Sequence, residues 1–229
     1  MRVGVSLFFA HQGAWASWED PSSGGPAPTP DWEFFEEEIS LGELVEPLGF
    51  DSIWSVEHHF SPISMTPNPL QFLTFFAGRT SAVEFGSMVT VLPWHDPVRL
   101  AEEISTLDNL LRGRGLTLGV GRGAAQREFD GYRVPMGESR SRFAESLEII
   151  RGTLSNERFS YAGQHFSFDD LSVRPQLRNP AVLDSMLCAW ASPATLEIAA
   201  NAGLGMLFVN AKPWEQYQKD VVQFNALRE

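Results

Sequence analysis

A carboxylate and two imidazoles stand side by side in the sequence, at Glu57, His58 and His59. They directly follow residues 50–56, Phe-Asp-Ser-Ile-Trp-Ser-Val, a short and mostly apolar segment that predicts a buried β-strand. Histidine titrates near neutral pH and can transfer protons under physiological conditions. Three such side chains at the end of a core strand are candidates for acid–base chemistry. A polar strand end with a capping histidine is the plainer alternative for any one of them.

Two further groups of residues could bind an anion. Residues 119–123, Gly-Val-Gly-Arg-Gly, follow another predicted strand, where the glycines let a ligand approach the backbone and Arg122 could pair with a phosphate. Ser192 and Thr195 open a predicted helix, whose free N–H groups and positive dipole end favour an anion. A tight turn and an ordinary helix cap are the alternatives. On neighbouring strand ends, Arg122 and Ser192 could share one phosphate.

Strand and helix patterns alternate along the chain and must position these residues. Strands are predicted over 2–9, 51–57, 84–92, 115–121, 186–190 and 204–209. Amphipathic helices are predicted over 32–48, 70–79, 97–111, 138–154, 192–202 and 213–227. Residues 156–185 break the alternation and predict a small inserted hairpin. Mostly apolar strands alternating with helices indicate a parallel sheet covered by helices, either doubly wound or closed as a (β/α)₈ barrel.

Composition narrows the classes of function. The formal net charge is −12 without a basic stripe, which argues against nucleic acid and anionic membranes as partners. Cys188 is the only cysteine, so no intrachain disulfide is expected, and no histidine–carboxylate spacing supports a metal site. His11 and His95 fall in strand-end loops, where we expect surface or pocket-lining side chains. Neither a signal peptide nor an apolar run of about 20 residues is apparent, so we expect a cytoplasmic protein.

Several blocks in order resemble the luciferase-like flavin-dependent monooxygenases, the group of bacterial luciferase. The blocks lie at 49–54, 57–60, 68–69, 91–93, 95–103, 107–108, 113–114, 119–123, 142–145, 192 and 199–203. The resemblance covers essentially the whole chain and implies a single domain over 1–229. The implied fold is an α/β (β/α)₈ TIM barrel. Because the sequence offers about six βα units, we expect that barrel to be incomplete.

The resemblance also implies roles for individual residues. The family's catalytic histidine falls on His58. The residues that the resemblance assigns to the cofactor are Met88, Val89, Arg122, Ser192 and Thr195. The first two back the flavin, often through a non-prolyl cis peptide bond, and the other three bind its phosphate. The reactive cysteine of luciferase is Gly121 here, so no thiol role carries over.

The implied activity is that of a two-component monooxygenase. A separate flavin reductase supplies reduced FMN, and O₂ is used to oxidise a hydrophobic organic substrate. Two alternatives stay open: an F420-dependent oxidoreductase that transfers a hydride, and a non-catalytic flavin-binding or partner subunit. Members of the family commonly dimerise through helices of the first units, so we expect a homodimer or a heterodimer. The apolar side chains of those helices are Phe72, Phe75, Phe76, Leu100, Ile104 and Leu107.

Overall fold

Six parallel strands form the central sheet, and they lie side by side in chain order. The computed structural model describes residues 1–20, 22, 29–189, 193–208 and 212–228. The strands are β1 (Gly4–Leu7), β2 (Ser52–Ser55), β3 (Glu84–Val91), β4 (Leu116–Gly121), β7 (Leu187–Ala189) and β8 (Gly205–Leu207). The predicted strands and their order are confirmed. A doubly wound sheet is excluded, because its strand order would reverse part-way.

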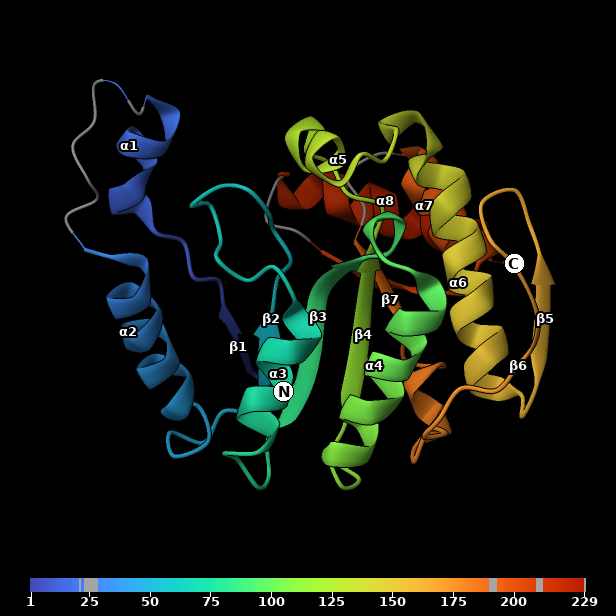
Figure 1. The fold of residues 1–229 in the computed structure, drawn as a ribbon, viewed down its shortest axis with the longest axis horizontal. Helices are drawn as coiled ribbons and strands as arrows, with labels where there is room; N and C mark the ends of the chain where they lie inside the picture. The colour runs from blue at the N-terminus through green and yellow to red at the C-terminus, as the bar shows by residue number, and fades with distance from the viewer. Residues whose placement is uncertain (21, 23–28, 190–192, 209–211, 229) are drawn as a thin grey trace.

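Helices follow the strands and pack outside the sheet (Figure 1). The longer ones are α2 (Asp31–Glu43), α3 (Pro69–Ala77), α4 (Pro97–Leu110), α6 (Ser139–Ser155), α7 (Pro193–Asn201) and α8 (Trp214–Ala226). The shorter ones are α1 (Trp15–Glu19), α5 (Gln126–Tyr132) and the 3₁₀ turns η1 (Gln12–Ala14), η2 (Leu92–Trp94), η3 (Met136–Glu138) and η4 (Pro180–Val182). Among the described residues β1 and β8 are the sheet edges, so the sheet is open. No helix of the described part is long and apolar enough to cross a membrane.

Side-chain caps fix where α3 and α4 begin. Asp96 Oδ1 accepts hydrogen bonds from the backbone N–H groups of Val98 and Arg99, at 3.0 and 2.9 Å. The Asn68 side chain caps α3 in the same way, and a proline follows each cap. Both helices therefore begin at the C-terminal ends of β2 and β3. We call the C-terminal ends of the strands, with the loops that follow them, the rim.

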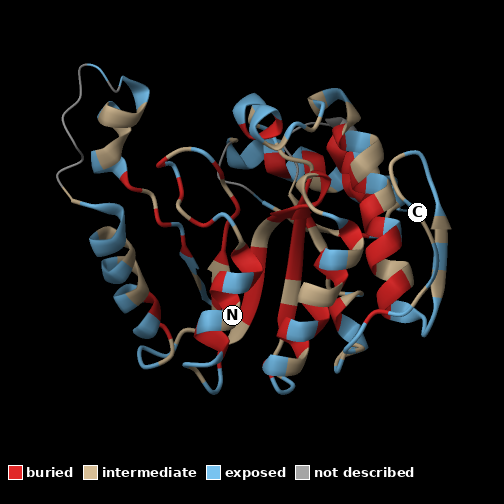
Figure 2. Cartoon of the chain, in the orientation of Figure 1, coloured by how far each residue is buried: buried red, intermediate tan, exposed pale blue. Residues whose placement is uncertain are grey.

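The core lies between the sheet and the inward sides of its helices, where Figure 2 shows the buried residues in red. Five of the apolar side chains on α3 and α4 belong to this core and are buried: Phe72, Phe76, Leu100, Ile104 and Leu107. Of the six side chains named above for these helices, only Phe75 stays open to solvent, at 36% exposure. The apolar stripe of an amphipathic helix covers the sheet first. Association through these helices stays a prediction.

An antiparallel hairpin interrupts the strand–helix alternation, as predicted for 156–185. It consists of β5 (Phe159–Ala162) and β6 (Ser167–Leu171). The Glu145 carboxylate on α6 accepts hydrogen bonds from three consecutive backbone N–H groups in the hairpin turn. Bonds to the charged form hold the pKa of Glu145 below its usual value, although burial alone would raise it. The hairpin turn is thus fastened to α6.

Candidate functional site

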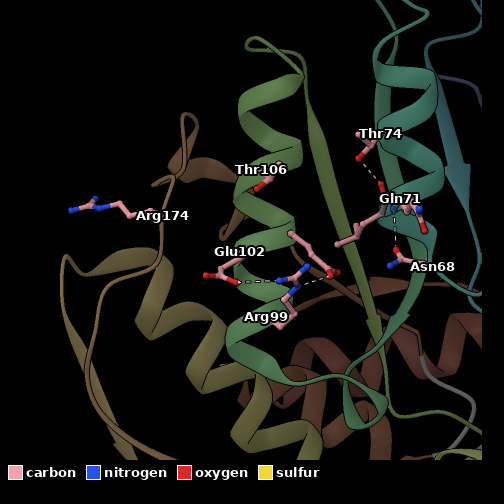
Figure 3. Close-up of a pocket in the computed structure, with 9 residues that line it drawn as sticks. Asn68, Gln71, Thr74, Arg99, Glu102, Thr106 and Arg174 are labelled. Carbon is pink, nitrogen blue, oxygen red and sulfur yellow. Dashed lines mark hydrogen bonds and ion pairs between the residues drawn. The ribbon is translucent and has the colours of Figure 1, made fainter.

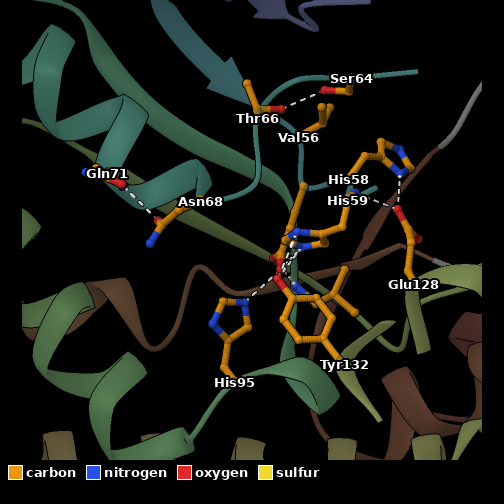
Figure 4. Close-up of polar contacts among 12 residues, drawn as sticks. Val56, His58, His59, Ser64, Thr66, Asn68, Gln71, His95, Glu128 and Tyr132 are labelled. Carbon is orange, nitrogen blue, oxygen red and sulfur yellow. Dashed lines mark hydrogen bonds and ion pairs between the residues drawn. The ribbon is translucent and has the colours of Figure 1, made fainter. Parts of the chain in front are cut away.

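Consecutive side chains that follow β2 point in different directions. Glu57 contacts Val91 at the end of β3 and His95 in the loop after it. His58 turns toward Glu128, whereas the His59 ring contacts Glu57 and Tyr132 (Figure 4). Successive residues of an extended chain point to opposite sides, which separates these neighbours in space. The three residues that the sequence places together therefore form two distinct polar groups.

The first group is centred on the buried carboxylate of Glu57. Its Oε1 lies 3.0 Å from His59 Nε2 and 2.8 Å from His95 Nε2, and its Oε2 accepts the Val91 N–H at 2.7 Å. Burial would raise the pKa of Glu57, but these hydrogen bonds and the charge of His95 hold it below its usual value. The same contacts raise the pKa of His95 against the effect of its own burial. These contacts therefore favour an ionised Glu57 and a protonated His95.

The two histidines expected at the surface or in a pocket lining differ in burial. The His95 side chain keeps 20% exposure and hydrogen-bonds to a buried carboxylate. His11 is buried, since its ring stacks on Phe34 at 4.6 Å and its Nε2 lies 2.8 Å from the Thr29 carbonyl oxygen. Helix α2 packs over this loop, which a sequence pattern does not reveal.

The second group joins His58 to Glu128 on α5. Glu128 Oε1 lies 3.1 Å from His58 Nδ1 and also accepts the backbone N–H of His59 at 2.8 Å. Burial would raise the pKa of Glu128, but the bonds from His58 and His59 hold it below its usual value. The ionised carboxylate accepts a hydrogen bond from Nδ1–H, so His58 Nε2 is left for a ligand. His58 keeps 34% exposure, with the Phe8 ring 5.9 Å away.

Helix α5 supplies functional groups that sequence reasoning missed. Glu128 and Tyr132 lie one helical turn apart and reach His58 and His59 respectively. Tyr132 Oη is 2.9 Å from His59 Nδ1. The helix has only seven residues, too few for an amphipathic period to stand out. An acid and a tyrosine four residues apart were the one available signal.

The predicted anion-binding residues partly come together at the end of β4. Arg122 Nη2 donates to Thr195 Oγ1 at 2.9 Å, and Nη1 donates to Ser139 Oγ at 3.4 Å. Arg122 Nε is buried and, within the described part of the chain, has no hydrogen-bond partner. Burial lowers the pKa of Arg122, and the nearby positive charge of Arg140 lowers it further. Ser192 lies outside the described residues.

Ser139 and Arg140 are the second set that the sequence analysis missed. They open α6, and Thr195 lies in the first turn of α7, so two helix N-termini face this end of the rim. No carboxylate among the described residues pairs with Arg122. Two neighbouring guanidinium groups, two hydroxyls and a buried unpaired N–H favour an anion with several oxygen atoms, such as a phosphate.

Met88 and Val89 lie on β3 beside this anion-binding end. Their peptide bond is cis, at the position where the family resemblance places one. A Cβ built on Gly121 would lie 2.6 Å from Val89 Cγ2, so the valine side chain covers the glycine. A side chain at 121 would therefore require the Val89 side chain to shift.

Other candidates for chemistry lie elsewhere. The described residues hold no group of three His, Cys, Asp or Glu side chains arranged for a metal. Burial raises the pKa of Cys188 to about 12, which keeps its thiol protonated. A groove of about 620 Å³ runs between α3 and α4, on the outside of the sheet (Figure 3). Arg99 in this groove already pairs with Glu102 and Glu103, so its positive charge is compensated and does not favour an anion there.

Comparison with known sequences places this arrangement in a family. The family model described as luciferase-like monooxygenase matches residues 1–229. The alkanal monooxygenase alpha chain of Photorhabdus luminescens is 30% identical over 169 residues, which are 74% of this chain and 46% of that protein. The chain thus spans about half the length of the curated relatives it matches.

Solved structures share the fold. Monooxygenase RslO1 from Streptomyces bottropensis has a TM-score of 0.85 and 31% identity, covering 100% of this chain and 66% of its own. Two more distant matches show the fold alone. The oxygenating constituent of 3,6-diketocamphane monooxygenase from Pseudomonas putida, in complex with FMN, has a TM-score of 0.74 at 19% identity, covering 98% of this chain and 63% of its own. The coenzyme F420-dependent tetrahydromethanopterin reductase of Methanopyrus kandleri has 0.70 at 20% identity, covering 99% and 60%. The fold and the match over the whole sequence show that this chain belongs to the luciferase-like monooxygenase family.

Proposed function

We propose that this chain is the oxygenating part of a two-component flavin-dependent monooxygenase. It would bind reduced FMN at the rim and use O₂ to oxidise a hydrophobic organic substrate. The observation that carries the proposal is the environment of Arg122, which contacts Thr195 and Ser139 and keeps a buried Nε–H without a described partner. An unpaired buried donor next to a second cation is costly unless an anion completes the site.

The residues present fit a flavin mononucleotide. The phosphate would lie against Arg122, Arg140 and Thr195, with Ser192 as a further proposed ligand. The flavin ring would lie over Met88 and Val89. Bound reduced FMN would supply the electrons with which O₂ is activated.

His58 would supply the proton chemistry. Its Nδ1 is held by Glu128, so a proton would be taken up or given at Nε2. Glu128 acts as a positioning residue, because it fixes the ring orientation and the tautomer without facing the ligand itself. Phe8 and Phe60 are 39% and 51% exposed near the histidines, which supports an apolar substrate.

The partners of this reaction are part of the proposal. A separate reductase would deliver the reduced flavin, and the chain would work as a homodimer or a heterodimer. The single-domain organisation over 1–229 is proposed on the same basis. Hydride transfer with F420 is the second candidate, favoured by the F420-dependent reductase that shares the fold. A flavin-binding subunit without turnover is the third.

Titration with reduced FMN and with F420, followed by oxygen uptake with NADH and a flavin reductase, tests the proposal. Arg122→Ala should weaken FMN binding by roughly 1–3 kcal/mol, the range for a hydrogen bond to a charged group. Arg158→Ala is the matched control, because Arg158 pairs with Asp170 on the hairpin, far from the rim. Equal FMN affinity in the two variants would remove the phosphate assignment. Binding and reduction of F420 without oxygen uptake would replace the proposed activity by the second candidate.

A further inference from the structure

A second acid–base assembly lies beside His58 and has no part in the role proposed above. It is a chain of hydrogen bonds through Tyr132, His59, Glu57 and His95 (Figure 4). Tyr132 Oη lies 2.9 Å from His59 Nδ1, and His59 Nε2 lies 3.0 Å from Glu57 Oε1. The same oxygen lies 2.8 Å from His95 Nε2. Four titratable groups are therefore in continuous contact.

The partners fix the direction of each hydrogen bond. An ionised carboxylate only accepts, so His59 and His95 both present an Nε2–H to Glu57. In its neutral form, His59 then has a bare Nδ1, which accepts a hydrogen bond from the Tyr132 hydroxyl. The resulting order of carboxylate, imidazole and hydroxyl is the one by which a catalytic triad activates its hydroxyl group.

The two inner side chains are buried, whereas the residues at both ends are partly exposed. The side chains of Glu57 and His59 are buried, but Tyr132 is half-buried and His95 is 20% exposed. Tyr132 belongs to α5, one turn from the residue that holds His58, so its end lies at the rim. His95 lies at the other end, where the charge of Glu103 in the outer groove acts on it.

Aromatic packing holds the tyrosine in place. The Trp94 ring stacks on Tyr132 at 5.8 Å and 20°, and meets His59 edge-on at 5.2 Å and 82°. Tyr132 and His59 are themselves perpendicular at 4.8 Å. This packing limits the rotamers of both rings, so the hydroxyl–imidazole contact is maintained without help from a ligand.

We propose that Tyr132 exchanges a proton with a ligand at the rim, activated by His59 and Glu57, while His95 exchanges the compensating proton with solvent. The Tyr132 oxygen takes the proton of a ligand O–H or N–H bond, and the ligand keeps the electron pair. The tyrosine's own hydroxyl proton passes to His59 Nδ1. Tyr132 would be a further catalytic residue, and His59, Glu57 and His95 would act through it.

The charges of His59 and His95 couple the two ends of this hydrogen-bonded chain. After the transfer, His59 and His95 would both be cations beside the single carboxylate of Glu57. The other charged or titratable groups that face them are Glu103, Glu128 and Tyr132. Two cations on one buried carboxylate are unfavourable, so the partly exposed His95 loses its Nδ1 proton to water. One proton enters through Tyr132 and one leaves through His95.

The first test needs no cofactor and is independent of the proposed function. NMR of ¹⁵N-histidine-labelled, flavin-free protein assigns the protons on each ring. We expect His59 to be neutral with its proton on Nε2, and His95 to carry both protons at neutral pH. Tyr132→Phe should shift the His59 Nδ1 resonance, whereas Tyr161→Phe on the hairpin should leave it unchanged. A His59 proton on Nδ1 would overturn the proposal, because Tyr132 would then have no proton acceptor.

The second test rests on the proposed function and uses FMN-loaded protein with its reductase. Tyr132→Phe keeps the ring and its stacking on Trp94 but removes the hydroxyl. Oxygen consumption should fall about 100-fold, as for loss of a general acid or base, and one ionisation should leave its pH profile. FMN affinity should stay within about twofold. A rate and pH profile equal to those of Tyr161→Phe would overturn the proposal. Failure of the proposed function would instead appear as wild-type protein that binds no FMN, and the NMR test would still decide the proton arrangement.

Discussion

His58 and His59 are adjacent in the sequence, yet the fold gives them opposite environments. His58 is 34% exposed and has one described polar partner, Glu128, on its Nδ1. His59 is buried and has a partner on each ring nitrogen, Glu57 on one side and Tyr132 on the other. An imidazole with a free nitrogen can touch a ligand, whereas one with both nitrogens engaged can act only through its neighbours. Within one dipeptide, His58 can therefore contact a ligand directly, whereas His59 can act only through Glu57 and Tyr132.

The largest expected effect is the loss of folding stability when the buried carboxylate of Glu57 is removed. Glu57→Ala leaves a protonated His95 and the Val91 N–H without their acceptor. Breaking a buried ion pair from one side costs about 3–5 kcal/mol of folding free energy. Denaturant unfolding should show a loss of this size. Glu43→Ala, which removes an exposed partner of Arg79, is the control and should stay within about 1 kcal/mol. Similar losses in the two variants would mean that the hydrogen bonds of Glu57 contribute no more to stability than an exposed ion pair.

The second prediction contrasts the two histidines in turnover. His58→Ala should lower kcat about 100-fold or more with little change in FMN affinity, because a general acid or base acts in the transition state. The variant should keep nearly wild-type stability, since His58 is partly exposed. His59→Ala should lower the unfolding free energy as well as the rate. Weakened FMN binding at unchanged kcat in His58→Ala would make His58 a binding residue only.

Much of the fold could be predicted, because its signals are local. Apolar runs predicted the strands, and Asp96-Pro97 predicted the start of α4 through its cap. Residues directly following strands, such as His58 and Arg122, were identified because parallel strands gather their ends at one rim. These inferences need only the order of elements along the chain.

The rest depends on contacts between distant segments. Glu128 meets His58 across 70 positions, from a helix too short to recognise by its period. Arg140 belongs to an exposed turn of α6 in the sequence pattern, and only the fold brings its charge to Arg122. His11 is buried because α2 folds over its loop. Contacts between residues so far apart in the sequence cannot be predicted from the local sequence pattern.

The third prediction concerns the carboxylate that holds the exposed histidine. Glu128→Gln keeps the size of the side chain but replaces an ionised acceptor by a neutral amide. The His58 Nδ1–H then loses its charged partner, so the Nδ1–H tautomer is favoured less and Nε2 becomes a weaker base. We expect kcat to fall about 10–100-fold, as for other residues that orient a functional histidine. FMN titration should be unchanged, and an unchanged kcat would show that His58 needs no positioning.

The smallest expected effect concerns the pH dependence of stability, which the Glu57–His95 pair should influence and His58 should not. The folded-state pKa of Glu57 lies below its usual 4.5, so its contribution to stability is present above that pH and is lost as pH falls through the folded value. The pKa of His95 lies above its usual 6.5, so its contribution is full below that pH and is lost as pH rises through the folded value. Unfolding free energy measured against pH should therefore decline on both sides of a maximum between about pH 5 and 7. His95→Gln should flatten the alkaline decline, whereas His58→Gln should leave it in place. An alkaline decline that persists in His95→Gln would mean that Glu57 is not paired with a protonated His95.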